Sequence, residues 1–187
     1  MSDRIKDVKF EFGSPWLKYF TIKHDKGEWN MVSRRDDPLC TTGEIKADAV
    51  SIAAIHQETD KVVITKEYRY PLGDYEYGIP AGLIDEGETI EQAARRELKE
   101  ETGLEMTTIL RVTPPLYSSA GMTDEAVATI FVRCKGEHTS ENTEECEDIE
   151  TLLLDGYELR DLMAQEGNKF GTRGYLSLLV MQGWEMF

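Results

Sequence analysis

Residues 82–104 read GLIDEGETIEQAARRELKEETGL, and this segment carries more structural information than any other part of the chain. Thr89 can cap a helix, and Gln92, three residues later, can reach back to complete a capping box. Gly103 is the residue type that commonly ends a helix in the left-handed conformation. The segment therefore predicts a helix over residues 90–102.

Two acidic residues of this helix, Glu97 and Glu101, lie on its apolar face. At about 100° per residue, one face is apolar and the opposite face is hydrated. The apolar face contains Ile90, Ala93, Ala94 and Leu98, and the hydrated face contains Glu91, Gln92, Arg95, Lys99 and Thr102. Glu97 and Glu101 fall within the apolar face, where two carboxylates one turn apart repel each other and also lose water. We therefore expect positive charge between them.

A divalent metal is one source of that charge. Glu100 flanks the same edge, so three carboxylates at i, i+3 and i+4 converge, which suits a hard cation such as Mg²⁺ or Mn²⁺. Zinc is disfavoured because no Cys or His joins them. The alternative is an ordinary amphipathic helix whose acids pair with Arg95, Arg96 and Lys99. The inward position of Glu97 and Glu101 favours the metal.

The same segment resembles the Nudix box. That pattern is a glycine, five residues, a glutamate, seven residues, and then Arg-Glu-aliphatic-X-Glu-Glu-X-Gly-aliphatic. The chain matches every fixed position, namely Gly82, Glu88, Arg96, Glu97, Leu98, Glu100, Glu101, Gly103 and Leu104. The resemblance implies hydrolysis of a nucleoside diphosphate linked to another moiety, with Mg²⁺ or Mn²⁺ bound by the box. It also implies an α/β (α+β) fold, an αβα sandwich around a mixed β-sheet.

Composition narrows the choice of partners. The 187 residues include 21 Lys and Arg against 36 Asp and Glu, a net charge of −15. Such a surface is unsuited to nucleic acid, because phosphate contacts dominate that affinity. Three cysteines form no CxxC pair and no even disulfide set, which favours reduced thiols. MSDRIKDVKF has no apolar signal core, and the apolar runs are too short to span a membrane. We expect a cytoplasmic protein that binds neither nucleic acid nor membrane.

Strand and turn signals divide the chain into two parts. Residues 1–45 form a small antiparallel β element, with strands expected at 8–12, 16–23 and 29–33. Residues 46–187 form the catalytic domain. Its remaining strands are expected at 47–55, 61–68, 107–116, 127–134 and 149–154, and two further helices at 157–165 and 173–181.

Four motifs resemble the ADP-ribose pyrophosphatase branch of the Nudix enzymes. They are EYRYP at 67–71, PAG at 80–82, SAG at 119–121 and ECEDI at 145–149. The resemblance implies that Arg69 contacts substrate phosphate and that the Ala81 carbonyl joins Glu97, Glu100 and Glu101 as a metal ligand. It further implies Glu145 as the catalytic base, Glu147 as an auxiliary ligand, and Ser119 and Gly121 at the terminal sugar. Taken without the resemblance, residues 141–150 are a solvated acidic loop.

Two departures concern the sugar end of the substrate. Ala120 replaces the proline of the branch, and Gly78 stands where a glutamate commonly precedes the PAG turn. A UDP-sugar or another nucleoside diphosphate sugar therefore remains an alternative to ADP-ribose.

The resemblance also assigns a role to the N-terminal element. In the resembling enzymes this element is exchanged across a homodimer, and its aromatic residues stack on the adenine. Trp16 and Trp29 are the candidates for stacking, and Arg34 or Arg35 for phosphate. The alternative is that both tryptophans are core or interface residues.

These observations predict a metal-dependent enzyme that cleaves ADP-ribose to AMP and ribose 5-phosphate, with Glu145 and Glu101 as catalytic residues. A UDP-sugar diphosphatase and a catalytically silent ADP-ribose-binding module are the alternatives. Silent members typically lose box glutamates, and this chain keeps them all.

Overall fold

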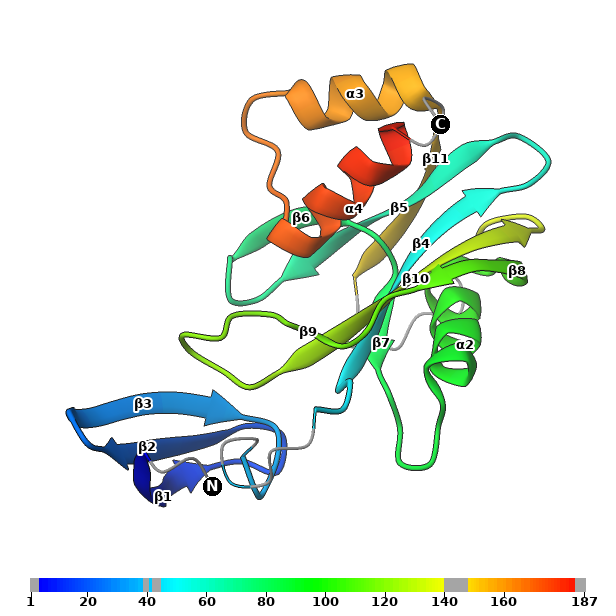
Figure 1. Ribbon diagram of the computed structural model, residues 1–187. Helices are drawn as coiled ribbons and strands as arrows, with labels where there is room; N and C mark the ends of the chain where they lie inside the picture. Colours follow the sequence, from blue (N-terminus) through cyan, green and yellow to red (C-terminus); the bar gives the residue numbers. More distant parts are fainter. Residues whose placement is uncertain (1–3, 39–40, 42–44, 140–147, 184–187) are drawn as a thin grey trace. The chain divides into compact units, whose positions relative to one another are not determined.

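The computed structural model describes residues 4–38, 41, 45–139 and 148–183 (Figure 1). The chain divides into two compact units. The first comprises Met1–Asp48 together with Pro115–Val127, and the second comprises Ala49–Pro114 with Ala128–Phe187. The domain boundary expected at residue 45 stays a prediction. The first unit also includes a later segment, Pro115–Val127, that the strand pattern assigned to the catalytic domain.

The first unit contains the expected three-stranded antiparallel sheet. Its strands are β1 (Ile5–Gly13), β2 (Lys18–His24) and β3 (Gly27–Ser33), in the order β1-β2-β3. Trp16 precedes β2 instead of lying within it. Residues 119–123 approach β3, where the amide of Val32 donates to the Met122 carbonyl at 2.9 Å. This contact explains why Pro115–Val127 belongs to the first unit.

The second unit is built on the large mixed sheet, whose central order is β11-β5-β4-β10-β8. The strands are β4 (Ala49–His56), β5 (Lys61–Arg69), β8 (Glu105–Val112), β10 (Ala126–Lys135) and β11 (Ile149–Leu154). Two short strands, β6 (Asp74–Gly78) and β7 (Ala81–Leu83), pair with β5 and β4 respectively.

The strand expected over residues 107–116 is wrong in its extent. β8 ends at Val112, and a separate two-residue strand, β9 (Leu116–Tyr117), pairs with the start of β10. Pro114 and Pro115 lie between them. Proline has no backbone N–H to give to a sheet, so the ladder breaks there.

Helices cover both faces of this sheet. α2 (Ile90–Thr102) packs on one face, and α3 (Gly156–Ala164) and α4 (Thr172–Gly183) lie on the other (Figure 1). Successive residues of β4 alternate between the two faces: Ile52 packs in the core under α2, and Ala53 packs in the core under α3 and α4. The predicted αβα sandwich is confirmed. Among the described helices, none is long and apolar enough to cross a membrane.

The predicted helix has the predicted ends. Thr89 and Gln92 form both halves of the capping box, and Gly103 ends the helix at φ 74°. The prediction fails at Thr102, which was placed on the hydrated face and is fully buried. Its hydroxyl donates to the Leu98 carbonyl at 2.5 Å and accepts from the Leu104 amide at 3.2 Å. A hydroxyl satisfied in this way can be buried at little cost.

Candidate active site

Glu101 lies where the helix meets the sheet. Only 5% of its surface is exposed, which confirms its inward position. Its Oε2 accepts a hydrogen bond from the Ala81 amide at 3.3 Å. The Thr151 hydroxyl of β11 donates to the main-chain carbonyl of Glu101 at 3.1 Å. The carboxylate is therefore held at the start of β7, beside the PAG turn.

Glu97 reaches the same turn one helical turn earlier. A Cβ added at Gly82 would overlap the Glu97 carboxylate, so only glycine leaves room for that side chain. The glycine of the box is thus explained by close approach of a carboxylate to the backbone. Ala81, Gly82, Glu97 and Glu101 consequently meet at one place.

Arg96 supplies positive charge next to these acids. Its Nη1 donates to Glu97 at 2.7 Å and to Glu100 at 3.2 Å, while its Nε and Nη2 bind the two oxygens of Glu88 at 3.0 and 2.9 Å. The hydrogen bonds that Arg96 donates to Glu88 and Glu97 raise its pKa, although burial acts in the opposite direction. The same pairing with Arg96 lowers the pKa of Glu88. The pairing of Glu97 and Glu100 with Arg96 is therefore observed, as the alternative of an ordinary amphipathic helix expects.

The donor set fits a hard divalent cation in its chemistry. Glu97, Glu101 and the peptide at Ala81 offer oxygen ligands, which Mg²⁺ and Mn²⁺ prefer, and the space at Gly82 accommodates the Glu97 carboxylate. Glu100 is half exposed and turned toward Arg96. Within the described residues, no three Asp, Glu, His or Cys side chains are grouped closely enough to share a cation.

Arg69 lies on the same side of the sheet as α2. Val63 of β5 packs in the core under α2, and side chains two residues apart in a strand share a face. Thr65, Glu67 and Arg69 therefore follow on that face, and Thr65 pairs with Thr151, which contacts α2. The guanidinium of Arg69 binds Glu67 at 2.7 Å and Glu76 at 3.2 Å.

Glu145 and Glu147, the expected base and auxiliary ligand, lie outside the described residues. The residues on either side of that segment are described. The Thr139 amide donates to the Thr102 carbonyl at 2.8 Å, and the Asp148 carbonyl accepts from the Tyr68 amide at 3.0 Å. The Tyr75 hydroxyl donates to Asp148 at 2.5 Å, and this bond raises the pKa of Tyr75. Thr139 is thus bonded to the end of α2, and Asp148 is bonded to β5.

Two residues near these groups escaped the sequence analysis: Glu76 and Thr151. Glu76 and Tyr75 belong to β6, which pairs with β5 so that Glu67 faces Glu76 and Tyr68 faces Tyr75. The sequence PLGD at 71–74 is a turn signal that could have identified this hairpin. Thr151 could not have been found, because its contact depends on how β11 packs against α2.

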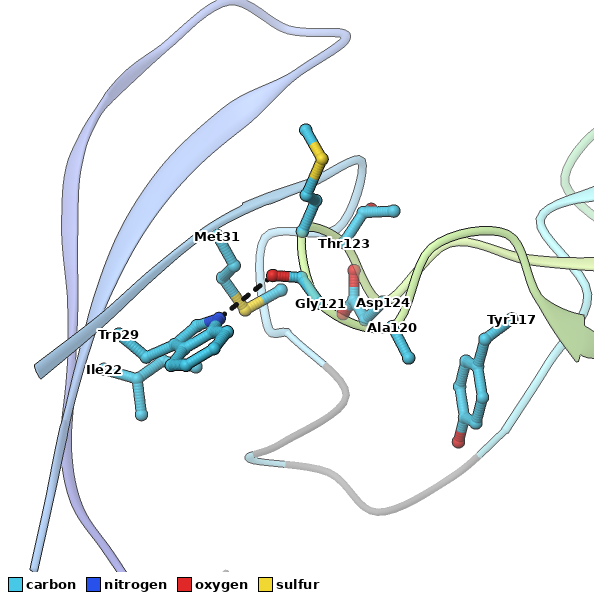
Figure 2. A pocket seen from close by; sticks show the side chains of 9 residues that line it. Ile22, Trp29, Met31, Tyr117, Ala120, Gly121, Thr123 and Asp124 are labelled. Carbon is cyan, nitrogen blue, oxygen red and sulfur yellow. Dashed lines mark hydrogen bonds between the residues drawn. The ribbon is translucent and has the colours of Figure 1, made fainter. Parts of the chain in front are cut away.

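Two of the predicted residues of the first unit, Trp29 and Gly121, lie together. Trp29 and Gly121 line an apolar cavity of about 260 Å³, and the Trp29 indole N–H donates to the Gly121 carbonyl at 3.1 Å. Figure 2 shows the indole nitrogen directed at that carbonyl, with Met31 beside the ring and Tyr117 farther along the lining. The two predicted residues, which are far apart in sequence, are therefore brought together.

The other predicted residues of this unit have different surroundings. The Ser119 carbonyl accepts from the amides of Met122 and Thr123 at 2.8 and 3.0 Å, which shapes the turn. Arg34, expected to reach phosphate, pairs with Glu125 at 3.0 Å. Trp16 is exposed and does not line the cavity.

Comparisons with known proteins show which family the chain matches. The NUDIX domain model matches residues 45–173. A Caenorhabditis elegans protein, whose name marks it as an unproven nudix hydrolase, is 36% identical over 136 residues, 69% of this chain and 59% of its own. An ADP-ribose pyrophosphatase of Bacillus subtilis is 39% identical over 79 residues, 42% of each chain. The chain thus spans about half the length of these curated relatives.

A solved structure shows the same fold. The crystal structure of an ADP compounds hydrolase superposes with a TM-score of 0.69 at 23% identity, covering 97% of this chain and 93% of that chain. The family model covers more than half of the present sequence and includes the box, the PAG turn and the β5 motif. The chain belongs to the Nudix family.

Proposed function

We propose that this protein hydrolyses the diphosphate of ADP-ribose to AMP and ribose 5-phosphate, with Mg²⁺ or Mn²⁺ as cofactor. The observation that carries the proposal is the meeting of Glu97 and Glu101 at the Ala81–Gly82 peptide, on the face of the sheet that also holds Arg69. The name of the Bacillus subtilis relative supports ADP-ribose as the substrate.

In this proposal, different residues of the second unit bind the metal, bind the phosphates and accept a proton. Glu97, Glu101 and the Ala81 carbonyl would hold the metal, with Glu100 adjacent. A bound divalent cation there would neutralise the diphosphate and lower the pKa of the attacking water. Arg69 binds phosphate oxygens, for which a guanidinium is well matched. Glu145 would accept the proton of the attacking water, and Glu147 would serve as an auxiliary ligand of the metal. To bind the metal, Glu97 would give up its hydrogen bond from Arg96. Arg96 would keep its hydrogen bonds to Glu88.

A UDP-sugar diphosphatase is the second candidate, favoured by Ala120 and Gly78 at the two departures from the branch. The cavity beside Trp29 suits a flat ring, because such rings bury area at low entropic cost. It does not by itself rank adenine above uracil. A silent ADP-ribose-binding module would bind the same ligands without turnover.

The deciding experiment compares kcat/KM for ADP-ribose, UDP-glucose and other nucleoside diphosphate sugars with Mg²⁺ and with Mn²⁺. We expect ADP-ribose to give the largest kcat/KM. A larger value for a UDP-sugar would select the second candidate. Binding of ADP-ribose in calorimetry without turnover of any substrate would select the silent module.

We also propose that the protein is a homodimer formed through the first unit. The first unit exposes four large aromatic side chains, and exposed apolar side chains of this kind can form an interaction site. They are Phe10, Phe12, Trp16 and Trp29. Sedimentation equilibrium of the full chain should give the mass of two chains. The mass of one chain at micromolar concentration would contradict this proposal. The cytoplasmic location stays a prediction from the sequence.

A further inference from the structure

Arg69 is held by two carboxylates that come from neighbouring strands. Its Nη1 lies 2.7 Å from Glu67 Oε1, and its Nε lies 3.2 Å from Glu76 Oε2. These contacts involve two of the five N–H donors of a guanidinium, so the same group can also bind an anion. The Arg69 side chain is 47% exposed, against 22% for Glu67 and 20% for Glu76. The arginine is thus the outermost member of the group.

The two carboxylates face each other directly. Glu67 and Glu76 are partners in the antiparallel register of β5 and β6. Like charges in this position destabilise a strand pair. A guanidinium that binds both carboxylates relieves the repulsion and, because it is planar, takes a fixed orientation between them. The arrangement therefore fixes the direction of Arg69 as well as its place.

The Glu76 side chain is bounded on its other side by Gly171. A Cβ added at Gly171 would overlap Glu76 Oε1. The backbone at this point is fastened along β6, since the Tyr77 amide donates to the Lys169 carbonyl at 2.8 Å and Lys169 pairs with Asp74. Gly171 has no positive φ, so a side chain there is compatible with the backbone. The atom it would displace is the free end of Glu76.

We propose that Glu76 is a positioning residue for Arg69, orienting the guanidinium toward the substrate phosphate. Gly171, having no side chain, leaves the space that the Glu76 carboxylate occupies in this arrangement. Glu67 provides the second anchor. This inference rests on the proposed function, because the phosphate-binding role of Arg69 belongs to that proposal.

The first test is kinetic. Glu76→Ala should lower kcat/KM for ADP-ribose by roughly 10- to 100-fold, the range expected for a misplaced binding group. Glu76→Gln keeps an oxygen acceptor of the same shape and should recover most of the loss. Gly171→Ala should lower kcat/KM in the same direction as Glu76→Ala. Gly183→Ala is the matched control and should match the wild type, because a Cβ there meets no described atom within 4 Å apart from its chain neighbours and its own helix backbone.

A double-mutant cycle separates positioning from a structural role. On an Arg69→Ala background, Glu76→Ala should cause no further loss of kcat/KM, because the group it orients is absent. An equal fold-loss on both backgrounds would overturn the inference. Wild-type activity in Glu76→Ala would overturn it as well.

A spectroscopic test is independent of the substrate. The Nε–H proton of Arg69, assigned by ¹⁵N NMR through its loss in Arg69→Lys, should be protected from exchange in the wild type and in Gly183→Ala. The protection should be lost in Glu76→Ala and in Gly171→Ala. Unchanged protection in both variants would refute the positioning role. If the wild type hydrolyses none of the substrates, the proposed function fails, and this measurement alone decides whether Glu76 orients Arg69.

Discussion

At the scale of single residues, Glu101 and Arg96 show what the pattern of a helix can and cannot predict. Helical periodicity placed Glu101 inward, and the structure buries it against the Ala81 amide. The same periodicity placed Thr102 in water, because it does not register a hydroxyl that bonds within its own helix. It also favoured a metal over an arginine as the partner of the acids, whereas Arg96 pairs with Glu97 in the structure. Arg96 binds Glu97 and Glu100 of its own helix, and it also binds Glu88, which lies in the preceding loop where helical periodicity does not apply.

Glu101→Gln tests the metal assignment at this scale. The change removes the charge and keeps the shape, so the fold should persist while turnover with Mg²⁺ falls by at least about 100-fold, as for loss of a strong transition-state contact. Binding of Mn²⁺, followed by electron paramagnetic resonance, should weaken in parallel. Glu91→Gln, an exposed acid on the same helix, is the control and should change neither quantity. Near-normal rates in Glu101→Gln would refute the assignment.

At the scale of helices and strands, the predicted ends match the structure where they are set by residues close together in the sequence. α2 begins and ends as predicted because the capping box and the left-handed glycine are local. β8 ends earlier than predicted because Pro114 and Pro115 have no backbone N–H to donate to a sheet. β6 and β7 were not predicted, since short strands are defined by the partners they find in the sheet.

The cap of α2 gives an element-scale prediction. Thr89→Ala removes the side-chain acceptor of the Gln92 amide and should lower the free energy of unfolding by about 1 kcal/mol. Thr89→Ser keeps the acceptor and should remain near wild type. Urea unfolding of the three proteins measures the difference. Equal stabilities of the alanine and serine variants would show that the cap contributes nothing.

At the scale of the whole molecule, the sequence predicted the αβα sandwich but not the membership of Pro115–Val127 in the first unit. That assignment depends on long-range hydrogen bonds such as Ala126 N–H to Asp48 at 2.8 Å. No local pattern marks such a bond. The role of Glu145 likewise rests on the resemblance, because Glu145 lies outside the described residues.

A buried cysteine links global stability to pH. Burial raises the pKa of the Cys134 thiol from 9.0 to about 12. The unfolded chain therefore loses this proton at lower pH than the folded chain, and stability falls as pH rises above the unfolded pKa. Between about pH 8.5 and about pH 10 the wild type should lose roughly 1 kcal/mol more unfolding free energy than Cys134→Ala. Parallel pH profiles of the two proteins, measured by urea unfolding, would contradict this prediction.

The most direct test of the proposed activity is analysis of the products formed from ADP-ribose in ¹⁸O-labelled water. We predict AMP and ribose 5-phosphate in equal amounts, formed only when Mg²⁺ or Mn²⁺ is present, with one ¹⁸O atom in the phosphate of one product. Absence of AMP in the presence of either metal, or release of ADP and free ribose, would contradict it.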